Sequence, residues 1–259
     1  MGIQEVGVPG RTGGTAEGRG HPASPVTRLA LFDLDDTLTD LSGAFSRWAA
    51  EFAVRYRLPD DAAAWLIAAR RGGPMAGFFA KVRQKFDLAE PAEQLWASYR
   101  ARIPQLVRLY PNALEDLGIL RTTGWRIGIV TNGMQDNQLA KLRRTGLDKA
   151  VDGYCISAAV GLRKPDPRIF RLAAQNCGTT LSPDDWVIGD SPDLDIAGGH
   201  NAGLRTLWIS HHRAWPQGQP PHRVATDLRE AVQILSEEPA PRATAIRPPR
   251  PVSEPSRTD

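Results

Sequence analysis

Short apolar runs alternate with amphipathic stretches along the middle of the sequence. The apolar runs cover residues 28–33, 125–131, 153–157, 185–190 and 204–210. Because each run is apolar almost throughout, it is typical of a strand buried on both faces of a parallel sheet. The stretches near 112–123, 135–145, 167–176, 193–202 and 226–235 have the pattern of helices. This alternation predicts an α/β fold with a doubly wound, Rossmann-like parallel sheet.

The interval between the first two apolar runs breaks this alternation. It contains no convincing strand and carries apolar residues at helical spacing, among them Leu41, Phe45, Trp48 and Phe52. A crossover between two parallel strands needs only one helix. We therefore predict that residues 41–107 form a small helical bundle, inserted as a second domain into a core made of residues 28–40 and 108–235.

The two ends of the chain differ in composition from everything between them. Residues 1–27 and 236–259 are rich in Gly and Pro and contain no Trp, Phe or Tyr. Such segments cannot bury enough apolar surface to offset the entropy of ordering. We predict that both are disordered tails.

Composition excludes several classes of protein. No apolar run approaches the roughly 20 residues that cross a bilayer, and the N-terminus lacks the apolar stretch of a signal peptide. The formal net charge is only +3, without a Lys/Arg block of the kind that binds nucleic acid. The 2 cysteines are too few for a disulfide framework. We expect a cytoplasmic protein without a membrane or nucleic-acid partner.

Acidic, hydroxyl and basic residues follow the predicted strands, where an open parallel sheet binds its ligands. They are Asp33, Asp35 and Thr37, then Thr131, Asn132 and Gly133, then Lys164, and finally Asp190 and Asp195. Each group alone is common as a turn or a helix cap, but their order along the chain favours a site. Because so many carboxylates repel one another, we expect a hard divalent cation with oxygen ligands, Mg²⁺, between them.

These positions resemble the motifs of the haloacid dehalogenase superfamily of hydrolases. The first motif, DxDx[TV], matches Asp33, Asp35 and Thr37; the others match Thr131, Lys164 and the GDxxxxD pair Asp190 and Asp195. The resemblance covers residues 28 to about 235 and is greatest to the nucleotidase and acylneuraminate-phosphatase branch. The helical insert resembles the C1 cap of that superfamily.

The resemblance implies an Mg²⁺-dependent phosphatase that hydrolyses a small phosphorylated metabolite, such as a nucleotide or sugar phosphate, as a monomer or homodimer. Asp33 would be the nucleophile that forms an aspartyl-phosphate, and Asp35 would protonate the leaving oxygen. The expected ligands of Mg²⁺ are the carboxylates of Asp33 and Asp190 and the backbone carbonyl of Asp35.

The remaining motif residues would support this reaction. Thr131 and the amides of Asn132 and Gly133 would hold phosphoryl oxygens together with Lys164. Asp195 would orient Lys164 or metal-bound water, and Thr37 completes the first motif.

Other functions stay open at this stage. Haloacid dehalogenases proper need neither a metal nor an acid at position 35, so Asp35 favours a phosphate ester. Phosphomutases share all the motifs. A non-catalytic module that binds a small ligand is the alternative from a different class.

Arg70 and Arg71 are candidates for substrate selectivity. They precede a Gly-Gly-Pro breaker between two helical stretches, where related C1-capped enzymes carry a specificity loop. An arginine there would clamp an acidic leaving group. The alternative is that both arginines cap the preceding helix and stay solvated.

Overall fold

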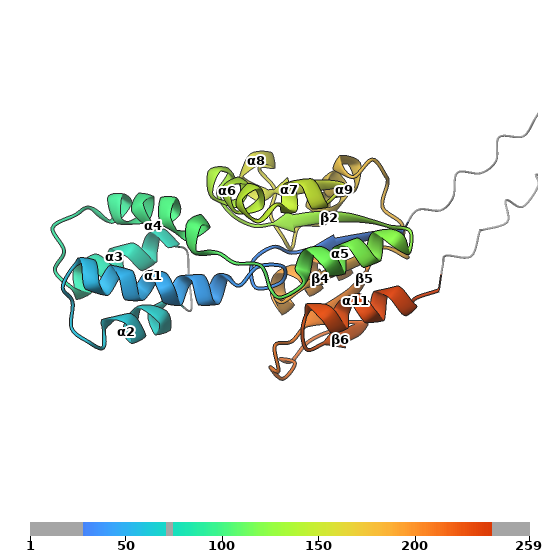
Figure 1. The fold of residues 1–259 in the computed structure, drawn as a ribbon. Coiled ribbons are helices and arrows are strands. Elements are labelled where there is room, and N and C mark those ends of the chain that lie inside the picture. Colours follow the sequence, from blue (N-terminus) through green and yellow to red (C-terminus); the bar gives the residue numbers. More distant parts are fainter. Residues whose placement is uncertain (1–27, 71–74, 240–259) are drawn as a thin grey trace, which may run out of the picture.

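The computed structural model of the chain describes residues 28–70 and 75–239. Figure 1 shows two parts: a sheet with helices on both sides, and a group of helices, α1 to α4, that projects from one end of it. The residues of α1 to α4 lie between the first two strands in the sequence.

The described strands form one parallel sheet in the order β3-β2-β1-β4-β5-β6. They are β1 (Arg28–Phe32), β2 (Trp125–Thr131), β3 (Gly153–Ile156), β4 (Trp186–Gly189), β5 (Arg205–Ile209) and β6 (Arg223–Ala225). The predicted α/β fold with a doubly wound parallel sheet is confirmed. Strand β6 was not predicted, because a three-residue edge strand carries no apolar run.

Both faces of the sheet are buried, which explains why the strands are apolar throughout. Leu29 and Leu31 of β1 share a cluster with the helix α9 (Pro167–Asn176). Ala30 and Phe32 point to the other face and share a cluster with α5 (Ala113–Thr122) and α11 (Leu228–Glu237).

Four further helices of the described residues lie in the connections between the strands. These are α6 (Gln135–Thr145), α7 (Leu147–Ala150), α8 (Ser157–Val160) and α10 (Ala197–Asn201). The stretch predicted as one helix over 193–202 is a π-helical turn, Pro192–Ile196, followed by α10. Ser191 caps this turn by accepting a hydrogen bond from the Leu194 amide.

The inserted helices have an apolar core of their own. They are α1 (Leu41–Arg55), α2 (Ala62–Ala69), α3 (Met75–Lys85) and α4 (Ala92–Leu106), and they share a cluster that contains Phe45, Trp48, Phe79 and Tyr99. The chain enters and leaves this part at neighbouring positions, because the Asp40 amide donates to the Arg108 carbonyl at 2.9 Å. Asp40 also caps α1 through its side chain.

The ordered core extends beyond residue 235, where the sequence predicted the second tail to begin. Helix α11 runs through Glu237, and the Glu238 carboxylate forms an ion pair with Arg205 at 2.7 Å. Arg28 also donates to the Glu238 carbonyl. These polar anchors hold a segment that composition alone assigns to the tail. Residues 1–27 and 240–259 lie outside the described residues.

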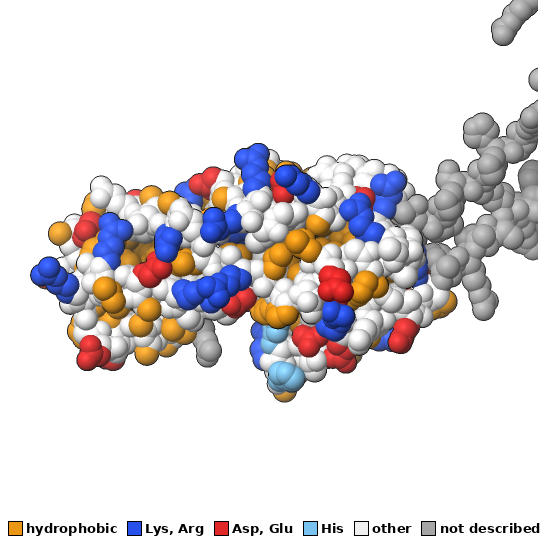
Figure 2. All heavy atoms as spheres, viewed as in Figure 1, with side chains coloured by type: hydrophobic (Ala, Val, Ile, Leu, Met, Phe, Trp, Pro, Cys, Tyr) orange, Lys and Arg blue, Asp and Glu red, His pale blue; other side chains and the backbone are white. Residues whose placement is uncertain are grey.

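Two surface properties bear on function. Among the described residues, no helix is both long enough and apolar enough to cross a membrane. On the face drawn in Figure 2, acidic side chains are interspersed with Lys and Arg, so positive charge does not form one continuous patch there.

Candidate active site

Lys164 links two carboxylates at the carboxyl edge of the sheet. Its Nζ donates to Asp33 Oδ1 at 2.5 Å and to Asp195 Oδ1 at 2.6 Å. Asp33 directly follows β1, and its amide continues the sheet by donating to the Ile188 carbonyl of β4. All three side chains are buried. The sequence therefore predicted correctly that these groups meet at one edge.

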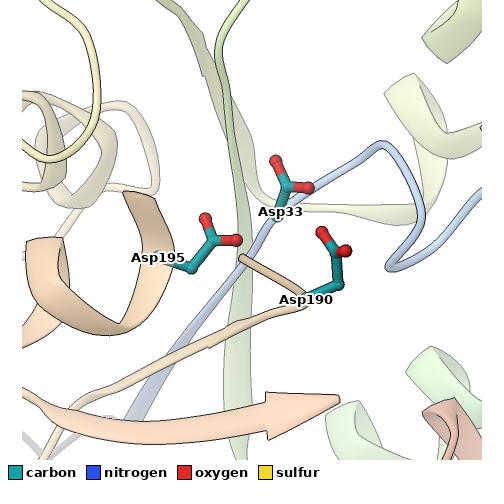
Figure 3. Close-up of side chains that lie close together, drawn as sticks. All are labelled: Asp33, Asp190 and Asp195. Atoms are coloured by element: carbon teal, nitrogen blue, oxygen red, sulfur yellow. The ribbon is translucent and has the colours of Figure 1, made fainter. Parts of the chain in front are cut away.

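Asp190, which follows β4, completes this group of acids. Carboxylate oxygens of Asp33, Asp190 and Asp195 lie within 4.8 Å of one another. Figure 3 shows the three side chains pointing toward a common space between the end of β1, the end of β4 and the turn that carries Asp195. Arg213 donates to the Asp190 carboxylate at 3.1 Å from the loop after β5.

Burial and crowding shift the pKa values of these groups. Desolvation raises the pKa of Asp33 well above its ordinary value, with Asp195 and Asp35 adding to the shift and Lys164 opposing it. Desolvation, Asp195 and Asp36 raise the pKa of Asp190 to about 7, against Arg213. Burial alone would lower the pKa of Lys164, but Asp195 and Asp33 raise it, so the ammonium stays charged. The site holds more negative charge than Lys164 offsets.

A divalent cation fits this group of side chains. The donors are carboxylate oxygens, which Mg²⁺ prefers, and they converge on one point. Burial, and after it the neighbouring acids, raise the pKa values of Asp33 and Asp190, and a bound cation would favour the charged form of both carboxylates. Asp195 belongs to this group of side chains, but its Oδ1 accepts a hydrogen bond from Lys164. The Asp35 backbone carbonyl stays the expected third ligand.

Gly189, the last residue of β4, makes room for Asp195. A Cβ atom at position 189 would lie 2.2 Å from Asp195 Cγ, well inside van der Waals contact. The Asp195 carboxylate is also fixed from the other side, because its Oδ2 accepts a hydrogen bond from the Ser191 amide at 3.0 Å. The glycine in the GDxxxxD motif is therefore required by packing against the aspartate that holds Lys164.

Asp35 lies beside two residues that the sequence did not single out. Lys141 of α6 donates to both carboxylate oxygens of Asp35, at 2.8 and 2.7 Å, and Gln138 donates to one of them at 3.0 Å. The Lys141 side chain is only 3% exposed. Both residues share a face of α6 with the buried Leu142. A lysine and a glutamine on the apolar face of a helix were the available sequence signal.

The groups expected to hold phosphoryl oxygens have hydrogen-bond partners within the protein. Thr131 Oγ1 accepts a hydrogen bond from Gln138 at 2.5 Å. The Asn132 side chain holds the backbone of Lys164 from both sides, since its Nδ2 donates to the Lys164 carbonyl at 3.0 Å and its Oδ1 accepts from the Lys164 amide at 2.9 Å. Asn132 thus positions Lys164 through its side chain.

The Gly133 amide has a partner within the protein. It donates to Ser157 Oγ at 3.0 Å, and a phosphoryl oxygen would have to replace this bond, so the expected role of the amide stays a prediction. The sequence did not reveal this bond, because Ser157 is distant from Gly133 in the sequence, at the start of the short helix α8 that follows β3. Thr37 is fully buried, and its Oγ1 has no hydrogen-bond partner among the described residues.

A cavity of about 480 Å³ extends from Asp35 to the inserted helices. Arg70 at the end of α2, Trp96 and Tyr99 of α4, and Lys141 of α6 line it, along with Arg163 from the loop before Lys164. The Arg70 guanidinium lies 4.7 Å from the centre of the Phe45 ring. Arg71 falls outside the described residues, so its expected role stays a prediction.

The sequence matches a known family over most of its length. Residues 30–209 match the family described as haloacid dehalogenase-like hydrolase. The chain is 39% identical over 126 residues to the pyrimidine 5'-nucleotidase YjjG of Escherichia coli (strain K12), which is 48% of this chain and 56% of that protein. It is 30% identical over 196 residues to a glyceraldehyde 3-phosphate phosphatase of Methanopyrus kandleri, which is 70% of this chain and 83% of that protein.

The fold also matches solved structures. The HAD-hydrolase YfnB of Bacillus subtilis, bound to magnesium, aligns with a TM-score of 0.69 at 24% identity over 81% of this chain and 98% of that one. This likeness shows the fold. The aligned segment spans only about half of the nucleotidase, but most of the phosphatase and of YfnB.

Proposed function

The chain belongs to the haloacid dehalogenase-like hydrolase family, and from this membership we propose that it is an Mg²⁺-dependent phosphatase of small phosphomonoesters. Its reaction proceeds through an aspartyl-phosphate on Asp33. One observation carries the proposal: Lys164 joins Asp33 and Asp195 at the sheet edge, beside Asp190, while Asp35 faces the adjoining cavity. The nucleophile and its counter-charge thus lie together, and the acid lies beside them on the adjoining cavity.

Asp33 attacks the phosphorus atom and displaces the leaving oxygen. Its raised pKa in the substrate-free site reflects burial and neighbouring acids, so the approach of a phosphate dianion requires added positive charge. Lys164 supplies one charge; Asp195 accepts from its ammonium, and the Asn132 side chain holds its backbone. Mg²⁺ bound by Asp33, Asp190 and the Asp35 carbonyl would neutralise further negative charge on the phosphoryl oxygens. Thr131 donates its hydroxyl to one of those oxygens.

Asp35 serves the leaving group. Asp35 lines the cavity in which that group would lie. It protonates the departing oxygen, and it then accepts a proton from the water that attacks the phosphorylated Asp33. Dehalogenation needs no such acid, because a halide leaves unprotonated. The presence of Asp35 beside the cavity therefore supports a phosphate ester as substrate.

The inserted helices act as a cap over the sheet edge. They supply the cavity wall opposite Asp35, so they contact the leaving group and set selectivity, with Arg70 as one contact. Related proteins are named for a pyrimidine nucleotide and for glyceraldehyde 3-phosphate, both small phosphomonoesters. The free, buried Cys155 and Cys177 fit a reducing compartment such as the cytoplasm. The enzyme acts there as a monomer or homodimer.

Release of inorganic phosphate tests this function. Wild-type protein with Mg²⁺ is expected to hydrolyse p-nitrophenyl phosphate and members of a panel of nucleotides, sugar phosphates and phosphorylated acids. Asp33→Asn keeps the shape of the side chain but removes the nucleophile, so kcat should fall by about 10³-fold or more. Asp193→Asn is the matched control, because Asp193 is an exposed acid in the same turn as Asp195.

Two outcomes would contradict the proposal outright, and a third would identify a different phosphoryl-transfer reaction. One is phosphate release by Asp33→Asn at more than about a tenth of the wild-type rate, a barrier difference under about 1.4 kcal/mol. The other is halide release from 2-haloacids in excess EDTA without any phosphatase activity, which would identify a dehalogenase. Phosphoryl transfer within a sugar phosphate, without phosphate release, would identify a mutase.

A further inference from the structure

The cavity beside Asp35 carries a surplus of positive charge. Among the described residues, four cationic side chains line it, Arg70, Arg100, Lys141 and Arg163, against the single carboxylate of Asp35. In the proposed reaction the phosphoryl group binds Lys164, which does not line this cavity. The cations of the cavity therefore lie where the leaving group would bind.

Two of these cations already have a carboxylate partner. Lys141 pairs with Asp35, and Arg100 pairs with Asp136 at the start of α6. Arg70 and Arg163 form no ion pair with any residue in the described part of the chain. The unmatched charge in the cavity thus comes from these two arginines.

The two arginines belong to different parts of the molecule. Arg70 ends α2 in the inserted helices, and the face of the Phe45 ring supports its guanidinium. Arg163 is exposed and directly precedes Lys164, whose backbone Asn132 holds in place. A ligand in the cavity would meet one arginine from the cap and one from the sheet, with the phosphoryl site next to the second.

The rest of the lining fits a short carbon skeleton. Leu41, Met75, Trp96 and Tyr99 supply apolar surface, and the volume of about 480 Å³ is at the small end for a ligand site. Such a cavity suits a small organic leaving group that has an anionic end. A guanidinium binds carboxylate and phosphate oxygens through two parallel N–H bonds, which a neutral hydroxyl cannot match.

We propose that the leaving group of the natural substrate carries a second anion, a carboxylate or a second phosphate, and that Arg163 together with Arg70 binds it. Arg163 is then a specificity residue of the sheet part, next to the lysine that serves every phosphomonoester. This inference rests on the proposed function, because it concerns the leaving group of that reaction.

Matched pairs of esters test the inference. In one pair, 3-phosphoglycerate has a carboxylate where glycerol 3-phosphate has a hydroxymethyl group. In the other, fructose 1,6-bisphosphate has a second phosphate where fructose 1-phosphate has a hydroxyl. We expect wild-type kcat/KM to favour the anionic member of at least one pair by about tenfold or more, equivalent to about 1.4 kcal/mol. The pair that shows it identifies the anion.

Variants assign the preference to residues. Arg163→Gln and Arg70→Gln should each lower the ratio of kcat/KM for the anionic ester to that for the neutral ester by about fivefold or more. Arg171→Gln is the matched control, because Arg171 is an exposed arginine on α9 outside the cavity lining. The wild-type ratio should also decrease as salt is raised from about 0.1 M to about 1 M, since screening weakens exposed charges.

A binding measurement separates this inference from the proposed function. Isothermal titration of the Asp33→Asn protein with each member of a pair, in Mg²⁺, gives affinities without turnover. Tighter binding of the anionic member, weakened by Arg163→Gln in the same background, supports the inference even if no ester is hydrolysed. Equal affinities and equal kcat/KM within both pairs would overturn it, as would a preference that neither arginine variant changes. In both of these cases, phosphate release would still support the phosphatase.

Discussion

Replacing Lys141 with methionine should destabilise the fold far more than a typical ion-pair substitution. Lys141 Nζ lies 2.7 Å from Asp35 Oδ2, and the two side chains are 3% and 19% exposed. At this distance an effective dielectric constant of about 20 gives about 6 kcal/mol of attraction, much of which offsets the desolvation of the two charges. Removing the ammonium alone leaves the Asp35 carboxylate with only Gln138 and Thr39 as donors in the described part of the chain. We expect a loss of about 3 kcal/mol in the free energy of unfolding.

A double-mutant cycle measures the interaction itself. Urea unfolding at pH 7.5 would be compared for wild type, Lys141→Met, Asp35→Asn and the double variant. Each single substitution leaves one buried partner without its counter-charge and should lower the free energy of unfolding by about 3 kcal/mol. The double substitution should lower it by about 4 kcal/mol, which gives a coupling energy of about 2 kcal/mol. The Arg102–Glu51 pair has the same 2.7 Å separation, but its side chains are 42% and 45% exposed. Its coupling should be smaller and should weaken in salt. Equal coupling energies for the two pairs would refute the reasoning that burial sets the strength of the Lys141–Asp35 pair.

Three further outcomes are expected. Activity should require Mg²⁺, disappear in excess EDTA and not return with Ca²⁺, which accepts more ligands and binds carboxylates through both oxygens; full turnover in EDTA would exclude the metal. Gly189→Ala should lower kcat by about 10²-fold without unfolding the protein, because the new methyl group displaces Asp195 from Lys164; an unchanged kcat would show that Asp195 moves freely. Burial raises the pKa of Asp185 to about 6, so its contribution to stability is present below its unfolded pKa and is lost as the pH rises through about 6. The stability of wild type relative to Asp185→Asn should therefore increase by about 2 kcal/mol from pH 7 to pH 4, as followed by urea unfolding, and a pH-independent difference would contradict the raised pKa.

The sequence predicted the sheet well, because burial on both faces leaves an unambiguous signal. The runs at 125–131 and 204–210 correspond to β2 (Trp125–Thr131) and β5 (Arg205–Ile209). Strand β6 carries only three residues at the sheet edge, and its pairing with β5 comes from tertiary structure rather than from an apolar pattern. The sequence predicted the end of α11 at residue 235, two residues before its end at Glu237, for a similar reason. Arginines far away in the sequence hold Glu238.

Within the site, strand ends were predictable and partners were not. Asp33, Asp190 and Lys164 follow strands of a parallel sheet, so topology alone brings them to one edge. Lys141 lies 106 residues from Asp35. Its place on the apolar face of α6 indicates burial, but no local pattern predicts that Asp35 is its partner. The bond from the Gly133 amide to Ser157 joins two loops in the same way. Contacts of this kind depend on how helices and loops pack on the sheet, which a single sequence does not encode in a local pattern.

Chemical trapping of the enzyme during turnover tests the central proposal most directly. Wild-type protein would be mixed with Mg²⁺ and an excess of its best substrate, quenched in acid and reduced with borohydride. Reduction expels phosphate from an acyl phosphate and leaves an alcohol in place of the carboxyl group. Peptide mass spectrometry should then find homoserine in place of Asp33 after incubation with substrate, and unmodified aspartate without it. Rapid phosphate release with Asp33 unmodified at every time point, or with the modification on another carboxylate, would contradict Asp33 as the nucleophile.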